Sequence, residues 1–178
     1  NRSFNITGLT LGIAKKLSVP DDYFVLSQAL SFQYYDLNNY NTGLFTFGNG
    51  NSNNLAYTVG LSRNNTFNDP IYPEGGSSFN LSAKFSFPYS AVSNVDYKGL
   101  SQERQAQYDI ISQYSNSNKE DEIQKRTDAS TRIGEIDQER YKWLEFYKIK
   151  FKGEWYTKLA GKLILKPTFE FGFLGAYN

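Results

Sequence analysis

The sequence predicts an all-β fold, an antiparallel transmembrane β-barrel segment of about six strands with a long extracellular insertion. The main observation is an alternation of apolar and polar side chains with a period of two, which excludes a helix as the simple interpretation. It is clearest in residues 77–87, where the apolar positions are Phe79, Leu81, Ala83, Phe85 and Phe87. The apolar face is aromatic and the opposite face is polar, as expected for a strand between lipid and a watery lumen.

Composition is the second observation. The 178-residue chain has a mean hydropathy of −0.56 although 17% of its residues are aromatic. No segment resembles the roughly 20 apolar residues of a membrane helix, whereas half of every barrel strand is polar. The net charge of +1 does not indicate nucleic-acid binding. Because His and Cys are absent, the commonest general base, metal ligand and thiolate nucleophile are missing. We therefore expect no enzyme activity, catalytic residue, metal or cofactor.

The connections between strands are the third observation. Alternation predicts strands near 4–16, 24–35, 55–62 and 77–87 in the first half of the chain. Short connections at 17–23, 64–76 and 157–162 alternate with longer ones at 36–54 and 88–141. Since barrels of this class have short periplasmic turns and longer extracellular loops, the long connections are expected outside the cell.

The segment 88–141 differs from the rest because it is long, polar and charged. Residues 100–114 have some helical character, and 123–136 could form another turn or two. We predict an extracellular insertion that is dispensable for barrel closure. The expected organisation is barrel strands in 1–87, the insertion in 88–141 and two further strands in 142–178.

The last two predicted strands lie near 147–155 and 163–173. The first carries lysines at 148, 150 and 152, and each would cost about 2–4 kcal/mol if it faced lipid at the bilayer midplane. Pro167 removes one donor from the second strand, so its pairing should be locally imperfect. The residues predicted to face the lumen are Asn80, Lys84, Lys148, Lys150 and Glu170.

Six strands are too few for a membrane barrel, because such barrels start at about eight. The first residue is not Met, and no signal peptide is visible. We therefore expect an internal piece of a longer secreted chain, with the remaining strands elsewhere in that chain.

The segment 63–77 resembles a turn of the BamA superfamily of barrel-assembly proteins, in which an Arg-Asp-rich turn precedes Phe-Pro-Thr-x-Gly-Ser. The positions that match are Arg63, Tyr72, Pro73, Gly76 and Ser77. The segment departs at Glu74, which replaces the usual Thr, and at Asn68-Asp69, whose order is inverted. Residues 155–159 and 171–175 also resemble strands that precede the family's long sixth extracellular loop. The aromatic richness and large insertion resemble members from the Bacteroidota.

The resemblance implies the central subunit of the machinery that folds and inserts outer-membrane proteins, located in the bacterial cell outer membrane. Its expected partners are outer-membrane lipids and lipopolysaccharide, client outer-membrane proteins, and accessory lipoproteins or surface proteins, with no nucleic acid. Independently of the resemblance, Pro73 fixes its φ angle and Gly76 permits a tight reversal, so the turn is predicted to set strand register rather than perform chemistry.

Three other interpretations remain open at this point. The first is an outer-membrane channel or transporter barrel, and the second is a superfamily member with a fused lipase-like domain. The third is a soluble β-sandwich, which requires a second sheet to cover the aromatic face. Acidic pairs such as Asp121 and Glu122 are interpreted as solvated charges in the insertion.

Overall fold

The structure, a computed structural model, describes residues 2–39, 47–67 and 73–177. Within these ranges the protein is mostly antiparallel β-sheet, as the sequence predicts, with a smaller helical part. The chain divides into two compact units. The sheet unit comprises Leu9–Phe32, Leu55–Phe87 and Glu145–Asn178, and the helical unit comprises Asn1–Gly8, Gln33–Asn54 and Pro88–Leu144.

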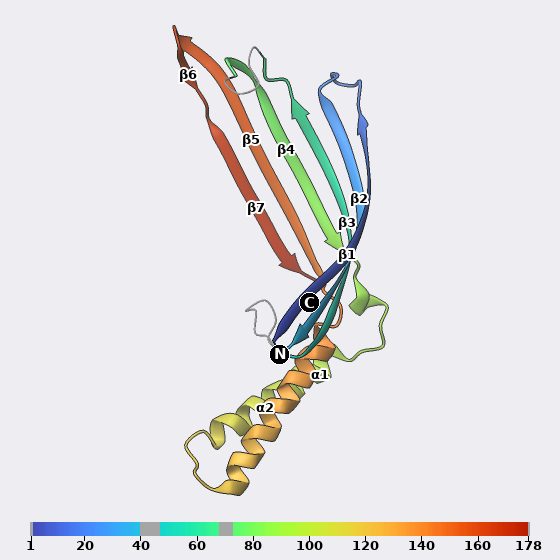
Figure 1. Ribbon diagram of the computed structural model, residues 1–178, viewed down its shortest axis with the longest axis vertical. Helices are drawn as coiled ribbons and strands as arrows, with labels where there is room; N and C mark the ends of the chain where they lie inside the picture. The colour runs from blue at the N-terminus through green and yellow to red at the C-terminus, as the bar shows by residue number, and fades with distance from the viewer. Residues whose placement is uncertain (1, 40–46, 68–72, 178) are drawn as a thin grey trace. The chain divides into compact units, whose positions relative to one another are not determined.

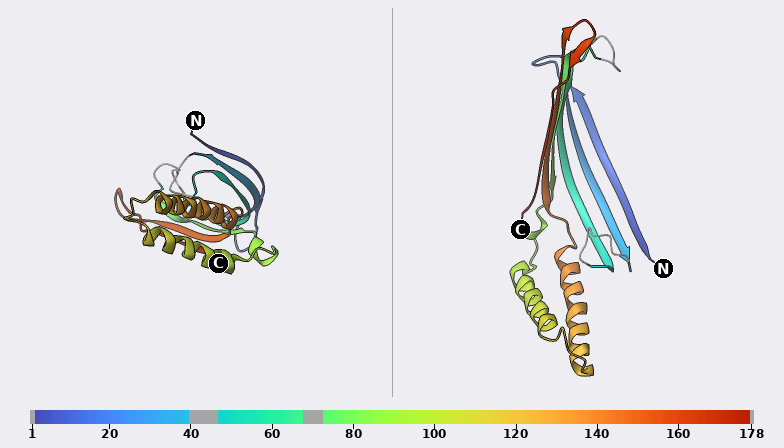
Figure 2. Two further views of the ribbon diagram at one scale, coloured as in Figure 1. Left: turned by 90° about the horizontal axis from the view of Figure 1, so that it is seen from below. Right: turned by 90° about the vertical axis from the view of Figure 1, so that its left-hand side faces the viewer.

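In the described residues, seven strands form a single sheet in the order β1-β2-β3-β4-β5-β6, and β7 pairs with β5 along the stretch that β6 leaves free. Their bounds are β1 Ser3–Lys16, β2 Phe24–Asn38, β3 Gly50–Asn64, β4 Gly75–Ser86, β5 Phe146–Ala160, β6 Leu163–Leu165 and β7 Thr168–Ala176. The sheet is open: it is not closed into a barrel, and β1 and β7 lie at its two edges (Figures 1 and 2).

Strand register separates the side chains into two faces, because directly opposed residues of an antiparallel pair share a face. Leu61 is opposite Leu81, Leu81 is opposite Phe151, and Phe151 is opposite Phe171. We call this side the apolar face; it comprises Tyr57, Val59, Leu61, Phe79, Leu81, Ala83, Phe85, Tyr147, Ile149, Phe151, Phe169, Phe171 and Phe173. The polar face comprises Thr58, Gly60, Ser62, Asn80, Ser82, Lys84, Lys148, Lys150, Lys152, Glu170 and Gly172.

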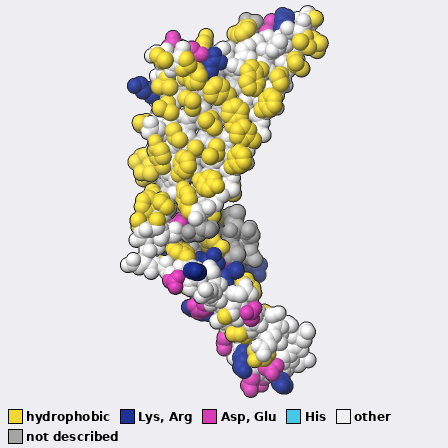
Figure 3. All heavy atoms as spheres, turned by 180° about the vertical axis from the view of Figure 1, so that it is seen from behind, with side chains coloured by type: hydrophobic (Ala, Val, Ile, Leu, Met, Phe, Trp, Pro, Cys, Tyr) yellow, Lys and Arg dark blue, Asp and Glu magenta, His cyan; other side chains and the backbone are white. Residues whose placement is uncertain are grey.

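Side chains of the apolar face remain exposed. Phe171 is 51% exposed and Phe173 is 62% exposed. Figure 3 shows one face of the molecule, on which hydrophobic side chains gather over the strands. A continuous apolar surface of this kind is unusual for a soluble monomer and indicates a contact with protein or membrane.

Several strands differ from their predicted extents. β2 continues to Asn38 and β5 to Ala160, so the predicted connections 36–54 and 157–162 both begin too early. β3 begins at Gly50, so the predicted loop 36–54 is wrong over its last residues. These residues are polar, but the Asn53 N–H donates to the Lys142 carbonyl and the Leu144 N–H donates to the Asn53 carbonyl, both at 2.8 Å. The predicted strand 163–173 is divided into β6 and β7 at Pro167, which confirms the expected irregularity. The Pro167 carbonyl still accepts from the Trp155 N–H at 3.2 Å.

The insertion contains a short 3-10 helix, Tyr89–Ala91, and a helical hairpin of α1 (Tyr97–Gln113) and α2 (Glu120–Arg140). The two α-helices run side by side (Figures 1 and 2). The helical character of 100–114 is thus confirmed, whereas the turn or two predicted for 123–136 is too short. None of the helices in the described residues combines the length and apolar character needed to cross a membrane.

Local signals explain why this polar segment is helical. The Asp96 side chain caps α1 by accepting a hydrogen bond from the Gly99 N–H at 2.9 Å. Glu120, Asp121 and Glu122 occupy the first turn of α2, where carboxylates interact favourably with the positive end of the helix dipole. Buried side chains of α2 are Ala129, Ile133, Ile136 and Asp137.

Candidate functional site: a two-faced sheet and its turn cluster

An aromatic row crosses the apolar face. The ring centroids of Phe24 and Phe79 are 5.7 Å apart, those of Phe79 and Phe151 are 6.3 Å apart, and those of Phe151 and Phe171 are 5.2 Å apart. These separations lie in the range of favourable aromatic pairs. The row joins β2, β4, β5 and β7, so the apolar face is an ordered layer of side chains with its outer side uncovered.

A polar residue within the apolar face has a specific partner. Gln28 interrupts the apolar positions of β2, which sequence reasoning could not explain. In the structure the Tyr57 hydroxyl donates to Gln28 Oε1 at 2.8 Å. The amide oxygen therefore has a hydrogen-bond donor on the neighbouring strand. The sequence did contain one relevant signal, a tyrosine on the neighbouring strand. Tyrosine is the aromatic residue type on this face that carries a hydroxyl donor.

The register places all five residues predicted to face a lumen on the polar face. Asn80 is opposite Lys152, and Lys152 is opposite Glu170. Lys84 is opposite Lys148, and Lys150 is opposite Ser82. Their common face follows from the structure, whereas the lumen itself remains a prediction.

An acidic residue that sequence reasoning passed over organises one end of the polar face. Glu154 forms ion pairs with Lys152 at 3.1 Å and with Lys166 at 3.3 Å. Glu154 Oε2 also accepts a hydrogen bond from the Tyr156 hydroxyl at 3.1 Å. The charge of Lys152 is thus balanced by the carboxylate of Glu154.

Arg63 joins two connections at the turn end of the sheet. Its Nε donates to Asp21 Oδ2 at 2.8 Å, and another guanidinium nitrogen lies 2.7 Å from the same oxygen. Arg63 also donates to Ser77 Oγ at 2.9 Å and lies over the rings of Tyr23 and Phe24. The hydrogen bond from Arg63 lowers the pKa of Asp21 below its ordinary value. We call Asp21, Arg63, Asn65 and Ser77 the turn cluster.

Gly76 permits a close approach of two backbones beside this cluster. Its φ is +95°, and a Cβ there would overlap the Asn65 carbonyl oxygen. Next to it, Asn65 Oδ1 accepts from the Ser77 N–H at 2.8 Å and from Ser77 Oγ at 3.1 Å. The structure thus brings Arg63 and Ser77 together and gives Gly76 a steric role within β4 instead of a role as a reversal.

The rest of the matched segment is less directly involved. Pro73 precedes β4, and Glu74 forms an ion pair with Lys158 at 2.9 Å. Tyr72 and Asn68-Asp69, on which the family resemblance also rests, lie outside the described residues.

In the helical unit, α2 is attached to the start of β3 by a side-chain amide. Gln138 Oε1 accepts from the Asn51 N–H at 2.8 Å, and Gln138 Nε2 donates to the Asn51 carbonyl at 2.6 Å. A Cβ on Gly50 would overlap the Gln138 amide, and the φ of Gly50 is +139°. These contacts, together with the bonds of Asn53, explain why 50–54 is a strand and not a loop.

The two helices are joined by ion pairs. Arg104 binds Asp137 through two contacts of 2.6 and 3.1 Å, and the Asp137 side chain is 1% exposed. Arg132 Nε donates to Glu103 at 2.8 Å, which lowers the pKa of Glu103. The exposed acidic residue Glu103 is therefore part of the contact between the helices.

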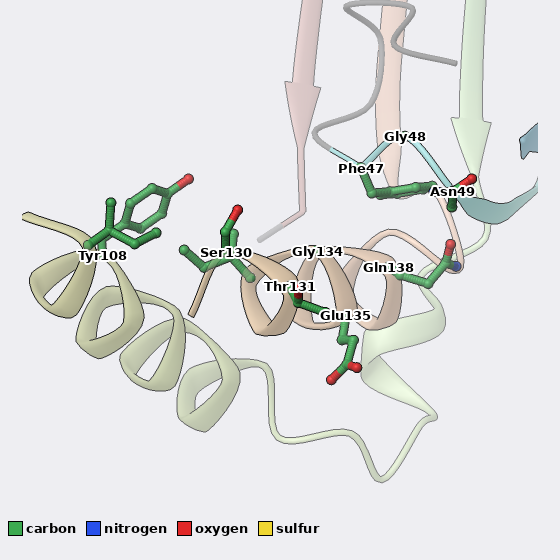
Figure 4. A pocket seen from close by; sticks show the side chains of 11 residues that line it. Phe47, Gly48, Asn49, Tyr108, Ser130, Thr131, Gly134, Glu135 and Gln138 are labelled. Atoms are coloured by element: carbon green, nitrogen blue, oxygen red, sulfur yellow. The ribbon is translucent and has the colours of Figure 1, made fainter. Parts of the chain in front are cut away.

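A cleft of about 620 Å³ lies beside the hairpin. Figure 4 shows Tyr108 from α1, side chains of α2, and residues 47–49 around it. The lining mixes hydroxyl, amide and apolar groups with one carboxylate, that of Glu135, which is paired with Arg132 at 2.8 Å. Within the part of the chain that the structure describes, no three acidic side chains gather to hold a metal ion.

Comparison with known proteins finds no matching family model, no matching curated protein and no matching solved structure.

Proposed function

We propose that this chain forms part of a transmembrane β-barrel in the bacterial outer membrane. The observation that supports the proposal is the separation of side chains by register into an exposed aromatic face and a face with four lysines. Lipid solvates aromatic side chains well and lysines poorly, so one face suits the membrane and the other suits a watery lumen. Further strands are required at the edges formed by β1 and β7, since a membrane barrel has no open edge.

Within this barrel, the polar insertion 88–141 belongs on the extracellular side. β4 and β5 pair directly from Gly75–Thr157 to Phe85–Tyr147, so their association does not depend on the hairpin between them. We propose that the hairpin is dispensable for barrel closure and that its cleft is a contact site for an accessory lipoprotein or surface protein. Deletion of residues 92–138 should still give a folded barrel, and loss of all folded protein would contradict this part of the proposal.

For the whole protein we propose the central role in outer-membrane protein assembly that the BamA resemblance implies. Arg63, Gly76 and Ser77 match the family's turn and contribute to the register between β3 and β4. In this function, client strands would be aligned by pairing with a strand edge. No catalytic residue is needed, because strand edges, lumen polarity and loop contacts provide the activity.

Depletion of the protein in its host cell tests this role. Assembly requires many unrelated outer-membrane barrels to decrease together, which quantitative proteomics of the outer membrane would measure. As a control, expression of the wild-type protein should restore the levels of these barrels, and expression of a variant that fails to fold should not. If a single solute is no longer taken up while other barrels assemble normally, the assembly role is wrong.

A channel or transporter is the second candidate, and the lysines favour it. Lys84, Lys148, Lys150 and Lys152 lie together on the polar face, where they would line a pore and attract anions. Conductance of the purified protein in planar bilayers distinguishes the candidates. A steady, anion-selective conductance combined with normal assembly of other barrels after depletion would favour the channel.

A further inference from the structure

Three lysines and a hydroxyl form a four-cornered group at the centre of the polar face. Lys84 is directly opposite Lys148, and Ser82 is directly opposite Lys150. Opposed residues have Cβ atoms about 5 Å apart, and alternate residues of one strand are about 7 Å apart. The three ammonium groups can therefore reach a single small ligand placed between them. Ser82 can contribute a hydroxyl donor at the fourth corner.

The surroundings of this group contain little that would neutralise it. In the neighbouring strands, Thr58 is opposite Lys84, and Leu174 is opposite Lys148. Gly172 is opposite Lys150, and the stem of Lys150 packs beside it without a side chain or charge on that residue. By contrast, Lys152 is paired with Glu154. The register thus gives Lys84, Lys148 and Lys150 uncharged residues or one another as directly opposed neighbours, and the carboxylate diagonal to Lys150 is Glu170, which is directly opposite Lys152.

Like charges placed directly opposite each other across two strands destabilise a sheet. Lys84 and Lys148 form such a pair, and both are half-buried, so water screens their repulsion less than at a fully exposed site. An anion bound between the lysines would remove this cost. The Phe146 ring lies 5.6 Å from Lys84 Nζ and forms an apolar border on that side.

We infer that Lys84, Lys148 and Lys150, with Ser82, form a binding site for a soluble multivalent oxyanion of the phosphate type. A phosphate group presents several strong acceptor oxygens at the spacing that converging ammonium groups can reach. The source is soluble because the site lies on the face opposite the aromatic surface. This site does not depend on an assembly activity, and it requires only that the polar face is in water.

Binding of pyrophosphate to the full-length protein in detergent micelles tests the site by isothermal titration calorimetry. Chloride at equal ionic strength controls for general screening. Lys84→Gln and Lys148→Gln each remove one charged hydrogen bond, so pyrophosphate affinity should decrease about tenfold. Lys152→Gln is the matched control, since that lysine is on the same face but paired, and its affinity should equal that of the wild type.

The thermal unfolding temperature provides a second measurement. For a lysine with a purely structural role, substitution should lower this temperature, whereas for a lysine of the anion site it should raise it. Without pyrophosphate, Lys148→Gln should raise the unfolding temperature because it relieves repulsion with Lys84. With pyrophosphate, the same variant should gain less stability than the wild type. Equal stabilisation by chloride, or wild-type affinity in both Lys84→Gln and Lys148→Gln, would overturn the site. Either result leaves the depletion test of the assembly role unaffected.

Discussion

The sheet unit and the helical hairpin are stabilised in different ways. In the sheet, the same pattern of opposed side chains is repeated across β3, β4, β5 and β7, so no single residue decides the arrangement. In the hairpin, α1 and α2 depend on individual polar contacts such as Arg104–Asp137, and α2 depends on Gln138 for its attachment to β3. A substitution in the sheet should therefore act according to its face, and one in the hairpin according to its partner.

The largest expected effect comes from a charge on the apolar face. Phe151→Arg places a guanidinium between the rings of Phe79 and Phe171. In a membrane-embedded barrel, the free energy of unfolding should fall by about 2–4 kcal/mol if this position is near the midplane. Asn80→Arg on the polar face is the matched control and should have little effect. Denaturant titration in lipid vesicles measures both, and equal losses would remove the distinction between faces.

In the hairpin, the largest effect should come from Asp137→Ala. The substitution leaves Arg104, which is 25% exposed at its side chain, without its buried carboxylate. We expect a loss of about 2 kcal/mol, which is below the cost for a fully buried pair because Arg104 retains contact with water. Hydrogen exchange of the α1 and α2 amides reports this loss. Glu103→Gln affects an exposed pair and is the control. Unchanged exchange in Asp137→Ala would mean that the helices are held by other contacts.

Gln138→Ala tests the attachment of α2 to β3. Two hydrogen bonds to the Asn51 backbone are lost, and water can replace part of them, so the local cost should be about 1–2 kcal/mol. Faster exchange of the Asn51 amide, with unchanged exchange in the β4–β5 ladder, is the expected signature. Gln124→Ala on the same helix is the control, because its amide bonds only to Asp128. Uniformly faster exchange throughout the sheet would show that the two regions are not independent.

The smallest effect is the acid sensitivity of the turn cluster. The pKa of Asp21 is lowered in the folded protein by Arg63. Its contribution to stability is therefore complete above the ordinary pKa of an aspartate and is lost as the pH falls through the lowered value. The unfolding temperature should decrease slightly more on acidification in the wild type than in Asp21→Asn. Identical acid dependence in the two proteins would show that the ion pair contributes nothing measurable to stability.

The difference between the sheet unit and the helical hairpin also determines which features can be predicted from sequence. Alternation at 77–87 and 147–155 indicates both the strands and their faces, because the period of two is a local property. The lysines of the polar face follow from the same period, and the irregularity at Pro167 follows from the missing N–H of proline, which is also a local property. The coarse architecture of the sheet unit was therefore accessible without a structure.

The missed features all depend on contacts between distant residues. Residues 50–54 look like a loop until Gln138 and Lys142 provide partners for their backbone. Likewise, Gln28 looks misplaced until Tyr57 is known to lie beside it. The length of α2 was underestimated because its sequence is polar, and its buried Asp137 is satisfied by an arginine from another helix. Sequence periodicity carries no information about such pairs.

Accessibility of spin labels on the two faces would show whether one face of the sheet is in lipid and the other in water. Labels would be introduced in the full-length protein in lipid vesicles, at Leu81, Phe85 and Phe171 on the apolar face and at Asn80, Lys150 and Glu170 on the polar face. Collisions with oxygen, which concentrates in lipid, and with a water-soluble nickel complex would be measured by electron paramagnetic resonance. If the apolar face is in lipid, the first set should show high oxygen and low nickel accessibility, and the second set should show the reverse. Equal nickel accessibility of both sets would contradict a sheet that separates lipid from water.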